Sequence, residues 1–101
     1  MAGTQSFWKA TVQTSAAQLL PYNPRRVGLI IKNYSGNPCF ISNDISDPAG
    51  QGFPLSVGDY LIMQKVNKDV PELQLYAIAS GGATELRIAE TFEVEEVVPA
   101  A

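Results

Sequence analysis

The sequence predicts an all-β fold, a single antiparallel β-sandwich or jelly-roll-like barrel of about seven or eight short strands with extended N- and C-terminal arms. Short runs of alternating or β-branched residues are separated by turn-forming Gly, Pro, Asn and Asp at intervals of about 8–12 residues. No window of helical length keeps the helical period of about 3.6 residues. The 101 residues, 46% hydrophobic and 17% charged, suit one domain with one core and argue against a disordered chain.

The first half of the chain contains strand patterns separated by turn residues. Residues 8–14 alternate large and polar side chains. The prolines within residues 21–24 end the next extended piece, because proline restricts its own backbone and that of the residue before it. Residues 27–33 are apolar and β-branched, and residues 39–42 follow a turn of Ser, Gly, Asn and Pro. We therefore expect residues 27–42 to form a hairpin.

A polar loop separates these strands from the second half of the chain. Four more strands are expected there, at residues 53–57, 60–65, 73–79 and 84–92. The turn at residues 80–82 is expected to join the last two strands as a hairpin. In the last strand, the alternation directs Leu86 and Ile88 toward the core. It directs Arg87 outward, with Glu90 as a further outward candidate.

The chain divides into three expected parts. Residues 1–13 are an N-terminal arm or first strand, residues 14–92 are the β-sandwich domain, and residues 93–101 are an acidic C-terminal arm that alternates glutamate and valine. The N-terminus has no basic run leading into an apolar segment, and no apolar stretch approaches the roughly 18–20 residues of a membrane helix. We therefore expect synthesis in the cytoplasm of the producing cell, without a membrane segment.

The composition lacks the residues of most catalytic and metal sites. The chain has no histidine, and Cys39 is its only cysteine, so it can form neither an internal disulfide nor a zinc cluster of cysteines. The oxygen-rich residues 43–47 lack the spacing of a calcium loop, and residues 80–83 lack that of a phosphate loop. The net charge of −3 disfavours nucleic-acid binding. We expect no catalytic site, metal or cofactor, and a semi-buried, unreactive Cys39.

Charge is unevenly distributed along the chain. Residues 1–50 carry four basic and two acidic side chains, whereas residues 51–101 carry three basic and eight acidic ones. A basic front and an acidic back suit contact between copies, although surface charges can also fall in this way without a partner. Phe7 and Trp8, close to the terminus, would either cap the core or dock on a partner. The candidate partner-contact residues are Phe7, Trp8, Arg25, Arg26, Glu93, Glu95 and Glu96.

Three segments carry a resemblance to a known family: TSAAQLLPYNPRRVGLIIKNYSGNPCFISND, GFPLSVGDYLIM and LQLYAIASGGATELRIAE. In this order they resemble small structural proteins of tailed-bacteriophage virions over most of the chain. Cys39, Asp59 and the acidic residues after Glu90 depart from the family pattern. The matching positions are Pro21, Asn23, Pro24, Arg26, Phe40, Ile41, Gly52, Phe53, Pro54, Leu55, Gly58, Tyr76, Ala77, Ile78, Ala79, Ser80, Gly82 and Arg87.

The resemblance implies a non-enzymatic decoration, or cement, protein that binds the outside of the capsid and stabilises the seams between capsomers. The implied partners are the major capsid protein, other virion proteins and further copies of the chain, with a trimer favoured and neither nucleic acid nor membrane. The implied location is the virion, at the capsid surface, after synthesis in the host bacterial cytoplasm. One alternative is a tail, neck or head-fibre component acting as an adaptor or host-contact module. Another is a carbohydrate-binding β-sandwich, for which the available aromatic residues are Trp8, Tyr34 and Tyr60.

Overall fold

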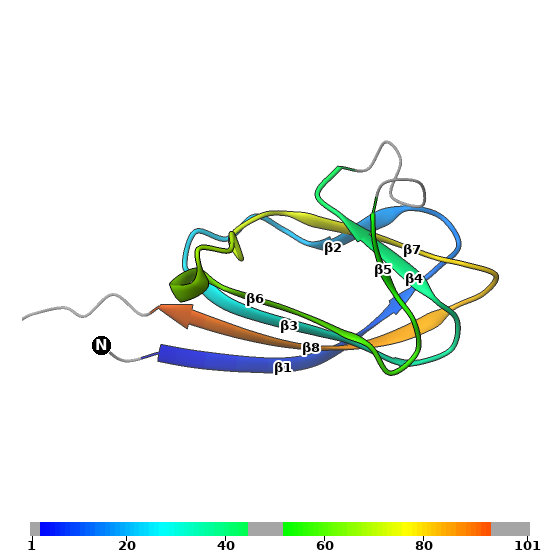
Figure 1. Cartoon of the computed structure of the whole chain (residues 1–101), viewed down its shortest axis with the longest axis horizontal. Coiled ribbons are helices and arrows are strands. Elements are labelled where there is room, and N and C mark those ends of the chain that lie inside the picture. The colour runs from blue at the N-terminus through cyan, green and yellow to red at the C-terminus, as the bar shows by residue number, and fades with distance from the viewer. Residues whose placement is uncertain (1–2, 45–51, 94–101) are drawn as a thin grey trace, which may run out of the picture.

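The computed structural model describes residues 3–44 and 52–93, which form two layers of β-strands (Figure 1). The elements are β1 (Gly3–Val12), β2 (Ala17–Leu20), β3 (Arg26–Ser35), β4 (Cys39–Ser42), β5 (Phe53–Leu55), β6 (Tyr60–Gln64), the 3-10 helix η1 (Lys65–Asn67), β7 (Leu75–Ala79) and β8 (Thr84–Glu93). One layer, the long sheet, has the strand order β1-β8-β3-β6, and the other, the short sheet, has the order β2-β7-β4-β5. All neighbouring strands are antiparallel. The predicted all-β sandwich is confirmed.

The pairing of the strands is nested. β1 pairs with β8, β2 with β7, β3 with β6, and β4 with β5. The pairs β3–β8 and β4–β7 then join these four ribbons into the two sheets. A nested ribbon that winds into two packed sheets of four strands is a jelly roll, which is the more specific of the two architectures expected from the sequence.

The prediction of two hairpins from the sequence is wrong, because in both cases the two strands lie in different sheets. β3 lies in the long sheet and β4 in the short sheet, so residues 27–42 form an arch over the core instead of a hairpin (Figure 1). The turn at residues 80–82 also crosses between the sheets, from β7 to β8. The inside–outside alternation of a strand is the same in a hairpin and in an arch, so it does not reveal which strand is the partner.

The two arches are bonded to each other at the same end of the sandwich. The backbone N–H of Asn37 donates to Thr84 Oγ1 at 3.0 Å, and that hydroxyl donates to the Asn37 carbonyl at 2.7 Å. The backbone N–H of Ser80 donates to the Pro38 carbonyl at 2.8 Å. Gly36 turns the first arch with a φ of 113°, a backbone conformation that favours glycine. These bonds satisfy backbone groups that a hairpin would have paired within one sheet.

The core lies between the two sheets and follows the alternation of the strands. In β8 it receives Leu86 and Ile88, as expected from the sequence. Trp8 and Ala10 of β1 are partly buried against it. Face-to-face packing of this kind removes one face of each sheet from water and leaves the other exposed. The buried hydrophobic residues are Val12, Leu20, Leu29, Ile31, Cys39, Ile41, Leu55, Leu75, Ala77, Ala79, Leu86 and Ile88.

The N-terminal segment is a strand of the sandwich over its described length. Gly3 to Val12 pair with Glu93 to Thr84 in one unbroken register, so residues 3–12 are not a free arm. Most of the predicted C-terminal arm, residues 94–101, lies outside the described residues. Within residues 3–44 and 52–93, no helix is long and apolar enough to cross a membrane.

Candidate interaction surface

The outer face of the long sheet carries a row of apolar side chains that crosses all four strands. Phe7 of β1 pairs with Ala89 of β8, Ala89 with Ile30 of β3, and Ile30 with Ile62 of β6. Phe7 is 74% exposed, Ile30 40% and Ile62 44%. This set, named here the apolar row, is continuous across the sheet because cross-strand partners point to the same face.

A second row of basic side chains lies two residues further along the strands. Lys9 pairs with Arg87, and Arg87 with Lys32, in the register that also aligns the apolar row. Arg87 has its guanidinium 4.1 Å from the centre of the Tyr34 ring and its Nε 2.7 Å from a carboxylate oxygen of Glu85. This basic row (Lys9, Arg87 and Lys32) lines a shallow depression of about 540 Å³ together with Phe7, Ala89 and Ile30 of the apolar row.

The two rows give this face the chemistry of a protein-contact surface. A contiguous apolar stripe on an exposed sheet face is more often an interaction site than a random feature of a surface. The neighbouring cations favour a partner with acidic groups at the matching position. Since Arg87 is already held by Tyr34 and Glu85, it loses little side-chain freedom when a partner binds.

Sequence reasoning missed most of this surface. Ile30 was expected only as part of an apolar strand, and Ile62 was not singled out. The available signal was the unbroken run Leu29-Ile30-Ile31, because strand alternation requires one or two of its members to face outward. The structure buries Leu29 and Ile31 and exposes Ile30.

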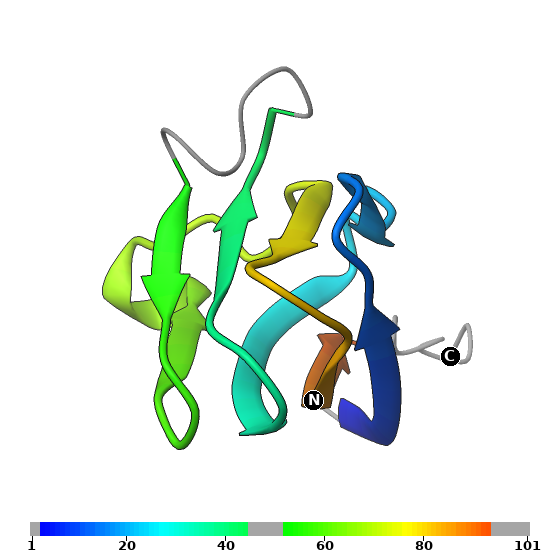
Figure 2. The same cartoon turned by 90° about the vertical axis from the view of Figure 1, so that its right-hand side faces the viewer.

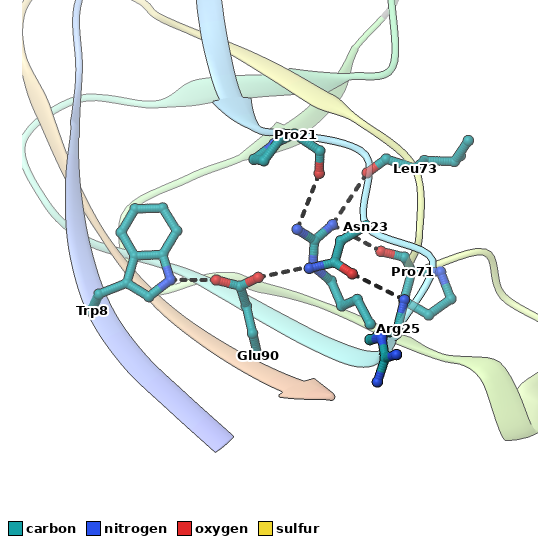
Figure 3. Close-up of polar contacts among 8 residues, drawn as sticks. Trp8, Pro21, Asn23, Arg25, Pro71, Leu73 and Glu90 are labelled. Atoms are coloured by element: carbon teal, nitrogen blue, oxygen red, sulfur yellow. Dashed lines mark hydrogen bonds and ion pairs between the residues drawn. The ribbon is translucent and has the colours of Figure 1, made fainter. Parts of the chain in front are cut away.

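The two aromatic residues near the N-terminus have different roles. Phe7 lies on the outer face, whereas Trp8 is half-buried against the core. The Trp8 indole N–H donates to an oxygen of Glu90 (Figure 3). Of the two expectations for this pair, core capping therefore describes Trp8, and Phe7 keeps an exposed ring that a partner could bind.

Arg26 is not an exposed contact residue, so its prediction as a partner contact is wrong. Its side chain is 1% exposed, and its Nε lies 2.9 Å from Glu90 Oε2. Glu90, the candidate outward residue of the last strand, is also buried. Each charge compensates the other in the interior, where either one alone would be costly.

The Arg26 guanidinium also bonds to three backbone carbonyls. It donates to Pro71 O at 3.1 Å, to Leu73 O at 3.4 Å and to Pro21 O at 3.1 Å (Figure 3). These carbonyls belong to two connections that are far apart in sequence, β2–β3 and η1–β7. Arg26 therefore fixes two loops to the end of the sandwich, and its role is structural.

Arg25 and Glu93 are exposed and meet through their backbones. The Glu93 N–H donates to the Arg25 carbonyl at 2.8 Å, and the Arg25 N–H donates to Asn23 Oδ1 at 2.9 Å. The structure therefore brings these two predicted contact residues together at one end of the long sheet. Glu95 and Glu96, predicted to lie at the same acidic edge, fall outside the described residues.

The remaining chemical candidates do not assemble into a site within the described part of the chain. Burial raises the pKa of the Cys39 thiol to about 11, so the nucleophilic thiolate is scarce near neutral pH. No group of three or more His, Cys, Asp or Glu able to hold a metal occurs among residues 3–44 and 52–93. Of the three aromatic residues suggested for carbohydrate binding, Trp8 is turned toward the core. Tyr34 and Tyr60 are 53% and 60% exposed, and the Arg87 guanidinium lies over one face of the Tyr34 ring.

Comparisons with known proteins identify the fold. No protein-family description and no curated protein match the chain. One solved structure is similar with a TM-score of 0.54 and 13% sequence identity, over 93% of this chain and 88% of the other. It comes from work on Bacillus endospore appendages, described as a novel family of disulfide-linked pili. At this identity the likeness shows a shared fold alone.

Proposed function

We propose that the chain is a non-enzymatic structural protein of a tailed-phage virion, which binds the outside of the capsid as a decoration protein. The observation that carries this proposal is the outer face of the long sheet, where the apolar row lies beside the basic row. A shallow, open surface of this composition suits contact with another protein surface, whereas a small-molecule site usually encloses most of its ligand.

The residues that resemble the phage family support the proposal through the fold. Among them, Arg26 bonds to the two loops at one end of the sandwich. Asn23 receives the Arg25 N–H in the turn before β3, and the Asn23 N–H donates to the Glu72 carbonyl at 3.0 Å. Two residues of the resembling segments, Asn23 and Arg26, therefore hold loops at one end of the jelly roll. The resemblance supports a virion protein with the same loop contacts.

Decoration would stabilise the particle by linkage. A protein that binds the assembled capsid and not its free subunits shifts the equilibrium toward the assembled state. Contact between copies on the capsid surface, with the major capsid protein as the main partner, completes the proposal. Neither nucleic acid nor membrane is required for this role.

The copy number of the chain in purified particles tests the proposal. Quantitative mass spectrometry against the major capsid protein would give a ratio near one to one, or one copy for each three-fold position, for a decoration protein. A ratio of a few copies per hundred capsid subunits would overturn decoration and favour a tail, neck or head-fibre component. Absence from purified particles would overturn a virion role altogether.

A further inference from the structure

The four edge strands of the sandwich differ in how well they are protected against pairing with another chain. β5 has three residues and contains Pro54, and β2 has four residues and a register shift. β6 has five residues and runs directly into the 3-10 helix η1. Short length, proline, irregular register and covering elements are the usual means by which an edge avoids strand addition.

Within residues 3–44 and 52–93, β1 has none of these protections. It is ten residues long, contains no proline, and keeps one register with β8 over its whole length. Lys9 is its only charged residue. Among the described residues β1 pairs only with β8, and it lies at the rim of the long sheet (Figure 2). Its other edge therefore presents backbone N–H and C=O groups in an order that another strand could pair with.

We propose that β1 pairs antiparallel with β1 of a second copy of this chain, with the two-fold axis at Phe7, so that two long sheets form one continuous eight-stranded sheet. A two-fold axis is the natural symmetry of this contact, because an antiparallel strand pair places the same edge of both copies against each other. The contact uses the β1 edge and leaves the loops at both ends of the sandwich available to other partners.

The side chains of β1 select the register. With the axis at Phe7, the two Phe7 rings lie opposite each other on the outer face, and each Lys9 lies opposite Gln5 of the other copy. An axis at Lys9 would instead place two cations directly opposite each other, which is destabilising. A facing aromatic pair stabilises strand pairing relative to a pair of small side chains.

The apolar row gives this register a second advantage. Phe7 is its member at the β1 edge, so the rows of the two copies join end to end through the facing rings. The doubled row would cross eight strands without a charged residue. The 74% exposed Phe7 ring, which has no cover among the described residues, would then be packed against its counterpart.

The oligomeric state in solution tests the contact. Light scattering after gel filtration, over a range of concentrations, should give a dimer for the unchanged chain. Phe7→Lys should shift it to a monomer, because it sets cations opposite each other. Ile62→Lys, which adds the same charge to the same row at the β6 edge, should remain dimeric. A monomeric or trimeric unchanged chain, or equal loss of the dimer in both variants, would overturn the proposal.

Cysteine cross-linking tests the register independently. Because Cys39 is buried, a newly introduced thiol is the only reactive one in the folded chain. Phe7→Cys should form a disulfide-linked dimer on mild oxidation, since directly opposed residues have Cα atoms about 4.5–5.5 Å apart. Lys9→Cys should not, since its counterpart would lie several residues away along the partner strand. The reverse result would overturn the assigned register. These outcomes do not depend on the copy number in particles, so the capsid proposal can fail separately.

Discussion

Arg26 and Glu90 form a buried ion pair that connects strands distant in the sequence, with 2.9 Å between Arg26 Nε and Glu90 Oε2. The other Glu90 oxygen accepts the indole N–H of Trp8. One carboxylate on β8 thereby bonds to side chains of both neighbouring strands, β3 and β1 (Figure 3). Both of its oxygens are satisfied, which is the condition under which a buried charge is tolerated.

Removing one member of this pair is expected to destabilise the fold strongly. Arg26→Met leaves the Glu90 charge buried and three carbonyls without the guanidinium, and Glu90→Gln leaves the arginine charge uncompensated. Each should lower the free energy of unfolding by about 3–5 kcal/mol, measured by urea denaturation. The double variant should cost less than the sum of the two. Additive effects would contradict a direct interaction.

Two glycines with positive φ should respond differently to alanine. A Cβ at Gly36 would lie 2.6 Å from the Ala83 carbonyl oxygen and 2.9 Å from Thr84 Cα, which are backbone atoms that cannot move aside cheaply. A Cβ at Gly58 would meet nothing within 4 Å. Gly58→Ala should therefore cost about 1 kcal/mol of backbone strain, and Gly36→Ala about 1–3 kcal/mol more. Similar midpoints of thermal unfolding for the two variants would contradict the tight contact between the arches.

Because the Cys39 thiol is buried, we expect the free energy of unfolding to fall at alkaline pH. The unfolded thiol ionises near its ordinary pKa of 9.0, whereas burial raises the pKa in the folded chain to about 11. Between these values the unfolded state has lost a proton that the folded state keeps. The contribution of this thiol to the free energy of unfolding is therefore fully present below pH 9. It is lost as pH rises toward 11, by at most about 1.4 kcal/mol per pH unit.

The matched control for this effect is Cys39→Val, which removes the thiol and keeps a small apolar side chain. Unfolding free energies of both proteins, measured from pH 8 to 11, should diverge in slope above pH 9, with the steeper loss in the unchanged chain. Parallel curves would show that the Cys39 thiol is not protected from ionisation in the folded state.

A substitution in the apolar row should weaken binding to the particle without changing the stability of the fold. Ile30→Lys places a charge in the middle of the proposed capsid-binding face, where the side chain is 40% exposed. Binding to particles lacking the protein should fall at least about tenfold, while the unfolding free energy should change by roughly 0.5 kcal/mol or less. Val57→Lys is the control, because Val57 is 49% exposed but lies in the β5–β6 turn. Equal binding by both variants would exclude this face.

The sequence alone was a good guide to local structure. The alternation along residues 84–92 placed Leu86 and Ile88 in the core. The turn residues correctly separated most of the strands, and the lack of a helical period predicted an all-β chain. The same alternation could also have placed Trp8, since Trp8 shares a strand face with Ala10 and Val12. These properties depend on neighbours in the chain, so a single sequence contains them.

The tertiary structure decided which strands pair and which polar groups are buried. The partners Arg26 and Glu90 are 64 residues apart in the sequence, and an arginine beside Arg25 or a glutamate near the acidic terminus gives no local sign of burial. The apolar row likewise combines one residue from each of four strands that only the nested jelly-roll pairing makes neighbours. Side-chain alternation fixes the face of each strand, but strand order depends on the free energy of long-range contacts, which becomes defined only when the whole sandwich closes.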